Sequence, residues 1–268
     1  MKWTLTVAAF LGALVLLCLP WGQSRGGAVN VLGSTSIQPF AEILAEEYHR
    51  NHPRQVVDVQ GGGSTAGLQA TLNGVVDIGM CSRGLKDDEK PLFQATVIAR
   101  DGLAIVVHPS NPIEGLTRDQ IRRMFAGQIT NWRDVGGDDR AVRLITREEG
   151  SGTREAFDKL VMGASHIAPE ALTQESNGAV QELVRHDRCA IGYMSLGLVG
   201  SDLRALRVDG RPATREQVKS KTQPYPLVRP FLFVTKGPPN DRARRFIDFV
   251  LSAHSQQILG REGLVEPP

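Results

Sequence analysis

Apolar and polar positions follow one another along the chain in a way that predicts strands and helices in alternation. Short β-branched runs at Ala28–Leu32, Val56–Gln60 and Val75–Gly79 are typical of buried strands. The first run is followed by apolar residues at helical spacing between Phe40 and Tyr48, and the second by a short helical pattern. Strand, helix and strand in this order predict parallel βαβ units, so the predicted fold class is α/β.

The rest of the chain continues this alternation without an internal repeat or a low-complexity linker. Apolar strands are predicted at Leu103–His108, Val142–Thr146 and Pro230–Val234, and a C-terminal helix follows the last of them. Thr117 and Gln120 form the pattern of a capping box at the start of a further helix. Because no linker is present, we expect lobes that are joined by ordered crossing strands rather than independent domains.

The first 28 residues differ from the rest of the chain. Lys2 precedes an uncharged stretch from Trp3 to Trp21, and small and polar residues follow as far as Ala28. A short positive region, an apolar core and a small-residue tail predict a secretory signal peptide over residues 1–28. Two alternatives stay open: an uncleaved anchor, since the stretch nearly reaches the length of a membrane span, and a lipoprotein modified at Cys18.

Composition limits the classes of partner. The 268 residues are 41% hydrophobic and 22% charged, which is ordinary for a globular protein, and the formal net charge is +2. Lys2 and Arg25 are the only charged residues before residue 29, so the remaining chain is formally neutral. A neutral chain offers no general attraction for nucleic acid or an anionic membrane. Cys81 and Cys189 show no metal-binding spacing, and we expect two buried free thiols, with a disulfide as the alternative.

Three predicted strands end in clusters of Gly, Ser and Thr that open a helix, at residues 33–36, 61–65 and 150–153. The start of a helix leaves backbone N–H groups without partners, glycine lets a ligand approach them, and hydroxyls add further donors. An ordinary helix cap explains any one cluster, but three in one chain favour an anion-binding site. Arg83 and Arg147 lie near two of the clusters, and a guanidinium matches a tetrahedral oxyanion; a surface ion pair is the alternative for each.

Sequence patterns for catalysis are missing. The chain contains no G-x-x-x-x-G-K-[ST] nucleotide loop, and Ser64 lacks the final glycine of a nucleophile elbow. The six histidines lie in mostly polar contexts, and no base can be assigned beside a nucleophile. We therefore predict a protein that is not an enzyme and has no metal and no cofactor, with a secreted phosphatase as the alternative from another class.

Six segments of the chain together form a recognisable set: Gly33–Pro39, Val59–Gly67, Asp77–Arg83, Phe125–Trp132, Arg147–Thr153 and Ala190–Ser195. They resemble signature segments of one known family, the phosphate-binding proteins of ABC transporters. Their order and spacing are specific, and the resemblance extends from about residue 29 to the C-terminus. It implies a periplasmic-binding-protein fold of the type II kind, with two α/β lobes joined by a hinge. One lobe would comprise residues 29–104 and 230–268, and the other residues 105–229.

The resemblance also implies a function and a site. The protein would bind inorganic phosphate outside the cytoplasm and deliver it, as a monomer, to the permease subunits of an ABC importer. A soluble sensor of phosphate is an alternative that the sequence does not separate from a transport protein. The phosphate-binding residues implied by the resemblance are Thr35, Ser36, Ser64, Ser82, Arg83, Arg147, Ser151, Gly152 and Thr153.

Ser82 departs from the pattern that many members of the family share. They have an aspartate before the arginine, and that aspartate accepts the proton of phosphate and so rejects sulfate. With serine at this position, a receptor for sulfate or another tetrahedral oxyanion stays an alternative. Asp77 and Glu148 are further candidates for the acceptor of the proton.

Overall fold

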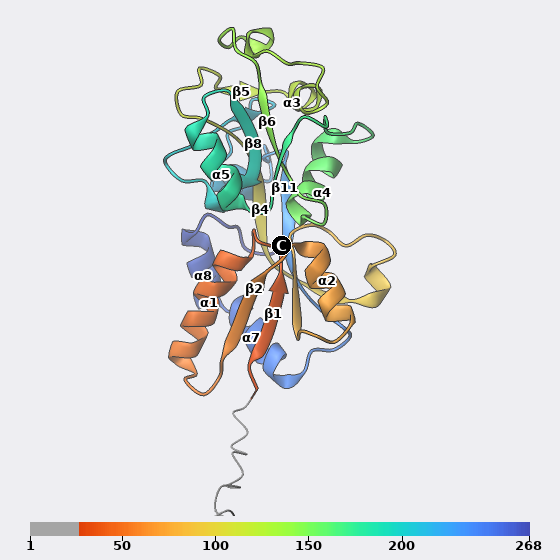
Figure 1. The fold of residues 1–268 in the computed structure, drawn as a ribbon. Helices are drawn as coiled ribbons and strands as arrows, with labels where there is room; N and C mark the ends of the chain where they lie inside the picture. Colours follow the sequence, from red (N-terminus) through yellow and green to blue (C-terminus); the bar gives the residue numbers. More distant parts are fainter. Residues whose placement is uncertain (1–26) are drawn as a thin grey trace, which may run out of the picture.

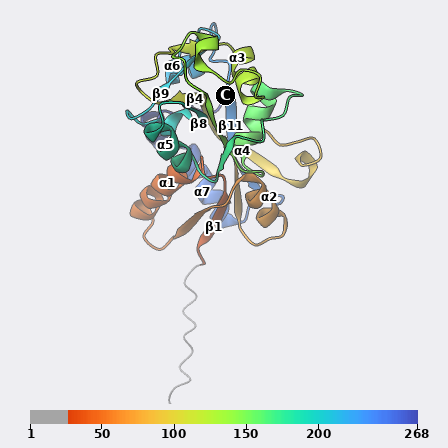
Figure 2. The same cartoon turned by 45° about the horizontal axis from the view of Figure 1, so that its top comes forward.

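The computed structural model describes residues 27–268, and nearly all of the predicted signal peptide, residues 1–28, lies outside them. The described chain forms two α/β lobes, one above the other in Figure 1. We call the first lobe the part built on β1, β2 and β3, and the second lobe the part built on β6, β7 and β8. Figure 2, tilted by 45°, shows the same two parts in contact, and no helix of the described residues is long and apolar enough to span a membrane.

The first lobe follows the βαβ order that the sequence predicts. Its elements are β1 (Val29–Gly33), α1 (Gln38–Asn51), β2 (Val57–Gly61), α2 (Ser64–Leu72), β3 (Ile78–Cys81), η1 (Lys90–Leu92), α7 (Asp241–Leu251) and α8 (Ala253–Arg261). β1 pairs in parallel with both β2 and β3. One boundary differs from the prediction. The strand predicted at Val75–Gly79 begins later, at Ile78, because the turn at Asn73 and Gly74 leaves Val75 exposed.

The second lobe contains the remaining short elements. They are β5 (Gly115–Leu116), α3 (Arg118–Phe125), η2 (Trp132–Val135), β6 (Arg143–Arg147), α4 (Gly152–Phe157), the π-helical turn η3 (Asp158–Met162), β7 (Leu172–Gln174), α5 (Asn177–His186), β8 (Ala190–Ser195), η4 (Leu196–Leu198), β9 (Arg204–Ala205), β10 (Arg207–Val208) and α6 (Arg215–Lys219). The predicted capping box is confirmed at α3, where the Thr117 and Gln120 side chains each accept from the other's backbone N–H.

Two long strands pass from one lobe to the other, β4 (Gln94–Val107) and β11 (Val228–Thr235). They pair with each other in antiparallel register, and the sheet order is β2-β1-β3-β11-β4-β8-β6-β7, with β9 also on β4. The first part of β4 pairs with β11, and its last part pairs with β8 of the second lobe. One sheet therefore extends through both lobes, and the C-terminus lies beside their boundary, where Val265 pairs with Arg100 (Figure 1).

The two faces of this sheet are covered by different helices. In β11, Phe231 and Phe233 join a core with α1, α7 and α8, whereas Leu232 and Val234 point to the opposite face and pack with Leu68 of α2. The alternation follows from the two-residue period of a strand. β4 continues the pattern in the second lobe: Leu103, Ile105 and Val107 pack with α3 and η3, and the residues between them pack with α5. Each lobe thus has its own core on each of the two faces of the sheet.

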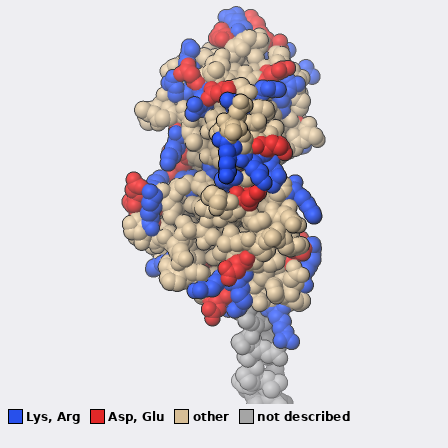
Figure 3. All heavy atoms as spheres, turned by 180° about the vertical axis from the view of Figure 1, so that it is seen from behind, with Lys and Arg blue, Asp and Glu red and all other residues tan. Residues whose placement is uncertain are grey.

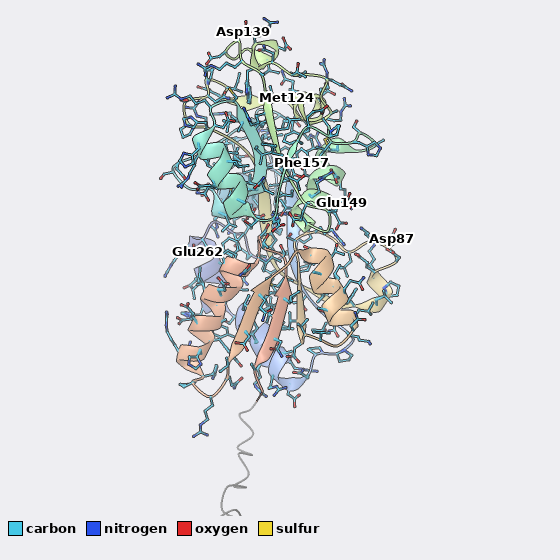
Figure 4. The ribbon with its side chains drawn as sticks, viewed as in Figure 1. Asp87, Met124, Asp139, Glu149, Phe157 and Glu262 are labelled. Atoms are coloured by element: carbon cyan, nitrogen blue, oxygen red, sulfur yellow. The ribbon has the colours of Figure 1, made fainter. Side chains whose placement is uncertain are left out.

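Charge is distributed over both lobes. Figure 3, a view from behind, shows basic and acidic side chains interspersed on that face of the molecule. Figure 4 places Asp139 at the far end of the second lobe and Glu149 near the boundary between the lobes. Such interspersion agrees with the formal neutrality of the chain after residue 28. A site for an anion must therefore be local.

Candidate anion-binding site

The three Gly, Ser and Thr clusters meet at the boundary of the two lobes, which we call the lobe junction. Each cluster lies between a strand and the helix that follows it, after β1, β2 and β6 (Figure 1). Oγ of Ser36 in the first lobe lies 2.7 Å from Oγ1 of Thr153 in the second. A Cβ atom added to Gly152 would lie 2.2 Å from Oγ of Ser64, so the backbone of one lobe directly faces a hydroxyl of the other.

Hydroxyls of the first lobe form a chain at this junction. Oγ of Ser34 accepts from the backbone N–H of Ser36 at 3.2 Å and donates to Oγ of Ser82 at 2.8 Å. The backbone N–H of Ser82 in turn donates to Oγ of Ser64 at 3.1 Å. All four residues are buried. The sequence predicted three of them, and Ser34 was missed although it belongs to the same Gly, Ser and Thr cluster.

The helix starts at the junction are shaped by local chemistry. Gly63 precedes α2 with a φ of 90°, a backbone conformation in which a side chain would be strained. Ser151 caps α4 by accepting from the backbone N–H of Arg154, and this leaves its hydroxyl hydrogen to donate elsewhere. The first N–H groups of both helices need partners from outside their helix. Neutral donors are thus concentrated where the two lobes meet.

Arg147, at the end of β6, places a buried guanidinium at the junction. Its Nε and Nη2 atoms donate to the Glu148 carboxylate at 3.0 and 2.9 Å and also to the carbonyl oxygens of Gln174 and Glu175. Nη2 also donates across the lobes to Oγ1 of Thr35 at 3.1 Å. The third nitrogen, Nη1, is buried and has no hydrogen-bond partner among residues 27–268. An unpaired donor on a buried cation is costly, so Nη1 is available to an acceptor from a ligand; Nε of Arg83 and Nε of Arg154 also lack a hydrogen-bond partner among these residues.

Tyr193 on β8 supports the backbone of Arg147. Its hydroxyl accepts from the N–H of Arg147 at 3.2 Å and lies 2.7 Å from Oγ1 of Thr146. The ring stacks on Phe157 with a centroid distance of 4.0 Å. Burial raises the pKa of Tyr193 to about 12, so the hydroxyl stays neutral. The end of β6, and with it the origin of the Arg147 side chain, is thereby fixed within the core.

Arg83, the other predicted cation, lies in a different environment. Its Nη1 and Nη2 atoms donate to the Glu89 carboxylate at 2.6 and 2.8 Å, and Nε lies 3.0 Å from Oε2 of Glu155 on α4. Lys86 reaches the same Glu155 oxygen at 2.6 Å. Two carboxylates therefore neutralise Arg83. Its contact with Glu155 on α4 makes it a bridge between the lobes. They give no support to the sequence-based expectation that Arg83 is the anion ligand of the first lobe.

A second buried cation at the junction, Arg229, was missed by sequence reasoning. It lies on β11 directly opposite Asp101 on β4, and its Nε and Nη2 atoms donate to Oδ2 of Asp101 at 3.0 and 2.9 Å. Nη1 donates to Oγ1 of Thr153 at 2.7 Å and to the carbonyl oxygen of Ser82 at 3.3 Å. Burial raises the pKa of the Asp101 carboxyl, and the neighbouring guanidinium opposes this shift. The pair of Arg229 and Asp101 therefore connects β11 and β4 to Ser82 of the first lobe and to Thr153 of the second.

The two carboxylates proposed as acceptors of the phosphate proton do not lie free at the junction. Asp77 accepts from the backbone N–H of Asn30 and from Nδ2 of Asn240, beside the start of β1, whereas the site follows its end. Glu148 is an ion-pair partner of Arg147. Residues 27–268 contain no group of three or more His, Cys, Asp or Glu placed to bind a metal. Both cysteines in this range are free; Cys81 is buried as expected, but Cys189 is partly exposed.

Two α/β lobes on a pair of crossing strands, with donors from both lobes at their junction, define a solute-binding protein. Comparison with known proteins agrees. Residues 22–254 match the family model described as a PBP superfamily domain. A crystal structure of a proposed phosphate ABC transporter substrate-binding protein from Clostridium perfringens, with bound phosphate, is 37% identical, covers 90% of this chain and 100% of that chain, and has a TM-score of 0.87.

Two further relatives point in the same direction. An ABC-type phosphate transport receptor from Vibrio cholerae is 38% identical over 89% of this chain and 100% of its own, with a TM-score of 0.75. The phosphate-binding protein PstS of Bacillus subtilis (strain 168) is 29% identical over 241 residues, or 88% of this chain and 79% of the relative. The chain belongs to the PBP superfamily and, within it, to the substrate-binding proteins of phosphate ABC transporters. The sequence-based expectations of fold and family are confirmed.

Proposed function

We propose that this protein binds inorganic phosphate between its two lobes and delivers it to an ABC importer. One observation carries the assignment: Nη1 of Arg147 is a buried cationic donor without a partner among the described residues, and it belongs to the junction where three helix starts converge. A tetrahedral anion supplies acceptors to such donors. The relatives named as phosphate-binding proteins, one of them solved with phosphate, support the same ligand.

The proposed ligands are those predicted residues whose donors point to the junction, with Arg147 as the cation. They are Thr35, Ser36, Ser64, Ser82, Arg147, Ser151, Gly152 and Thr153. We leave Arg83 out of this set because Glu89 and Glu155 already engage its guanidinium. Arg229 contributes a second positive charge behind Thr153, although Asp101 balances it.

We propose that the lobes close over phosphate about a hinge in β4 and β11, with residues 29–104 and 230–268 in one lobe and residues 105–229 in the other. Contacts across the junction support a closed arrangement in the structure. Besides the pair formed by Ser36 and Thr153, the backbone N–H of Thr65 donates to the carbonyl oxygen of Gly150 at 3.1 Å. Closure around a ligand by hinge bending is a common response of two-lobed binding proteins.

We further propose that the protein acts outside the cytoplasm as a monomer, contacts permease subunits in its closed form and has no enzymatic activity. The N-terminal sequence, with its pattern of a secretory signal peptide, supports the location. The relatives named as substrate-binding and receptor proteins of ABC transport support both the permease partner and the absence of catalysis.

Calorimetric titration of residues 29–268 with phosphate, and then with sulfate, tests this function. We expect phosphate to bind with a fitted stoichiometry of one. Because the Ser82 hydroxyl can either donate or accept, it should discriminate weakly. Ser82→Asp should raise the preference for phosphate over sulfate by about tenfold, since an unpaired lone pair facing sulfate costs about 1–3 kcal/mol. If wild-type protein binds neither anion, the proposed function is wrong. If it already rejects sulfate by about a thousandfold, an acceptor other than residue 82 sets the selectivity.

A further inference from the structure

A closed ring of hydrogen bonds lies behind the site, and four of its residues have no role assigned from the sequence. Its six members are buried and come from both lobes and both crossing strands. In order around the ring they are Ser36, Thr153, Arg229, Asp101, Ser195 and Asn177. The new links are Nδ2 of Asn177 to Oγ of Ser36 at 2.9 Å, the N–H of Ser195 to Oδ1 of Asn177 at 3.0 Å, and Oγ of Ser195 to Oδ1 of Asp101 at 2.9 Å.

Chemistry fixes the direction of the bonds that enter the two site hydroxyls. The backbone N–H of Ser195 can only donate, so the oxygen of the Asn177 amide must face it and the NH₂ group must face Ser36. A guanidinium has donors and no acceptor, so Arg229 can only donate to Thr153. Each hydroxyl oxygen therefore accepts one hydrogen bond from the ring.

These two bonds determine what the hydroxyls can offer to an anion. A hydroxyl has one hydrogen and two lone pairs, and the Ser36 and Thr153 oxygens are 2.7 Å apart, so one of them donates to the other. The oxygen that receives this bond has then filled both of its lone pairs, one from the ring and one from its neighbour. Its own hydrogen is free, so it can act only as a donor. The other oxygen keeps a single lone pair.

We propose that Asn177 and Arg229 are positioning residues that make the Ser36 and Thr153 pair present one obligate donor and one lone pair to the bound anion. Without the ring the pair would expose three lone pairs, and lone pairs facing an anion are repulsive. One donor and one remaining acceptor suit a phosphate that retains one hydrogen near neutral pH. The ring thereby supplies part of the discrimination that the serine at position 82 does not.

Asn177→Asp tests this role because the change is nearly isosteric and reverses the bond to Ser36. A carboxylate at 177 accepts the Ser36 hydrogen, Thr153 then donates to Ser36, and no hydrogen remains for the anion. We expect Kd for phosphate to rise about 100-fold at pH 8, since a charged acceptor is added and a donor is lost. In a Ser36→Ala background the same change should raise Kd only about tenfold, because the hydroxyl whose hydrogen bond it reverses is missing.

The pH profile separates this role from a structural one. The ratio of the Asn177→Asp Kd to the wild-type Kd removes the part of the phosphate titration that both proteins share. It should shrink at least about tenfold between pH 8 and pH 5, because a protonated carboxyl can donate to Ser36 again. The charged groups joined to residue 177 through its hydrogen-bond partners are Asp101 of β4 and Arg229 of β11. Arg147 of β6, which is paired with Glu148, donates to the backbone of Glu175, two residues before it. Asn111→Asp adds the same charge at a buried site elsewhere in the second lobe and should leave Kd unchanged.

Because this role presupposes the phosphate site proposed above, the outcomes must be kept apart. Failure of wild-type protein to bind phosphate overturns the function itself. If wild-type protein binds but the Asn177→Asp factor is equal in both backgrounds, the effect does not pass through Ser36 and the inference is wrong. A ratio that stays constant with pH would likewise overturn it, while leaving the phosphate function intact.

Discussion

Arg83 and Arg147 are both buried and both lie beside a Gly, Ser and Thr cluster, but their surroundings differ. Arg83 donates to Glu89 through Nη1 and Nη2, and its Nε lies 3.0 Å from Oε2 of Glu155, a charge contact without hydrogen-bond geometry. Arg147 meets one carboxylate, and its Nη1 atom has no partner among residues 27–268. The difference that favours Arg147 as the anion ligand is that one carboxylate faces its guanidinium, whereas two face that of Arg83. Burial and position alone do not distinguish a ligand from a bridge between lobes.

Removal of Arg147 should have the largest effect. Arg147→Ala leaves phosphate without its cationic donor in a site shielded from water, and we expect Kd to rise at least about 150-fold, or about 3 kcal/mol. Calorimetric titration measures the change. Arg143→Ala is the matched control, because Arg143 belongs to the same strand but is exposed and pairs with Asp187. An affinity of Arg147→Ala within about tenfold of wild type would contradict the assigned site.

A side chain at Gly152 should weaken phosphate binding by hindering closure of the lobes, without changing the charge of the site. The added Cβ of Gly152→Ala would lie 2.2 Å from Ser64 Oγ, so the lobes could not approach as they do in the structure. Overpacking of this kind costs about 1–3 kcal/mol, and we expect Kd to rise about 30-fold. Small-angle scattering should show the radius of gyration of wild-type protein falling with phosphate, and a smaller fall in the variant.

Gly178→Ala is the control for this change, since the nearest atom to a Cβ there is 3.9 Å away. With phosphate, the radius of gyration of the Gly178→Ala variant should fall as much as that of the wild type. A wild-type profile that does not respond to saturating phosphate would mean that the site is rigid, and the hinge in β4 and β11 would have to be abandoned.

Arg83→Ala should have the smallest effect on binding. The variant loses the bridge to Glu155 across the lobes but no contact with the anion, so its cost falls mainly on stability, because Glu89 and Glu155 are left without their buried partner. We expect Kd for phosphate to rise less than about tenfold. A loss as large as that of Arg147→Ala would show that Arg83 contacts the anion and that the distinction between the two arginines is wrong.

The parts of the site that could be predicted from the sequence depend on local chemistry. Glycine and hydroxyl residues between a strand and a helix mark a helix start wherever they occur, so Ser64 and Thr153 were recognisable without a structure. The fold class was recognisable for the same reason, because the strand and helix periods are local. The late start of β3 was not foreseen, because Val75 and Val76 have the composition of a strand but follow a turn.

The other parts depend on contacts between distant segments. Arg229 meets Asp101, which is 128 residues away in sequence, only because β4 and β11 cross side by side. Asn177 meets Ser36 across 141 residues when the lobes are together. A charged residue directly next to a long apolar run, as Asp101 and Arg229 both are, was the available signal. It indicates a buried ion pair, but the sequence does not name the partner.

A crystal structure of the protein grown with phosphate tests the central claim most directly. We predict a phosphate at the lobe junction whose oxygens accept from Nη1 of Arg147 and from one hydroxyl of the Ser36 and Thr153 pair. Arg83 should remain on Glu89 and Glu155 without contact to the anion. A phosphate bound by Arg83, with Nη1 of Arg147 still unpaired, would contradict the account.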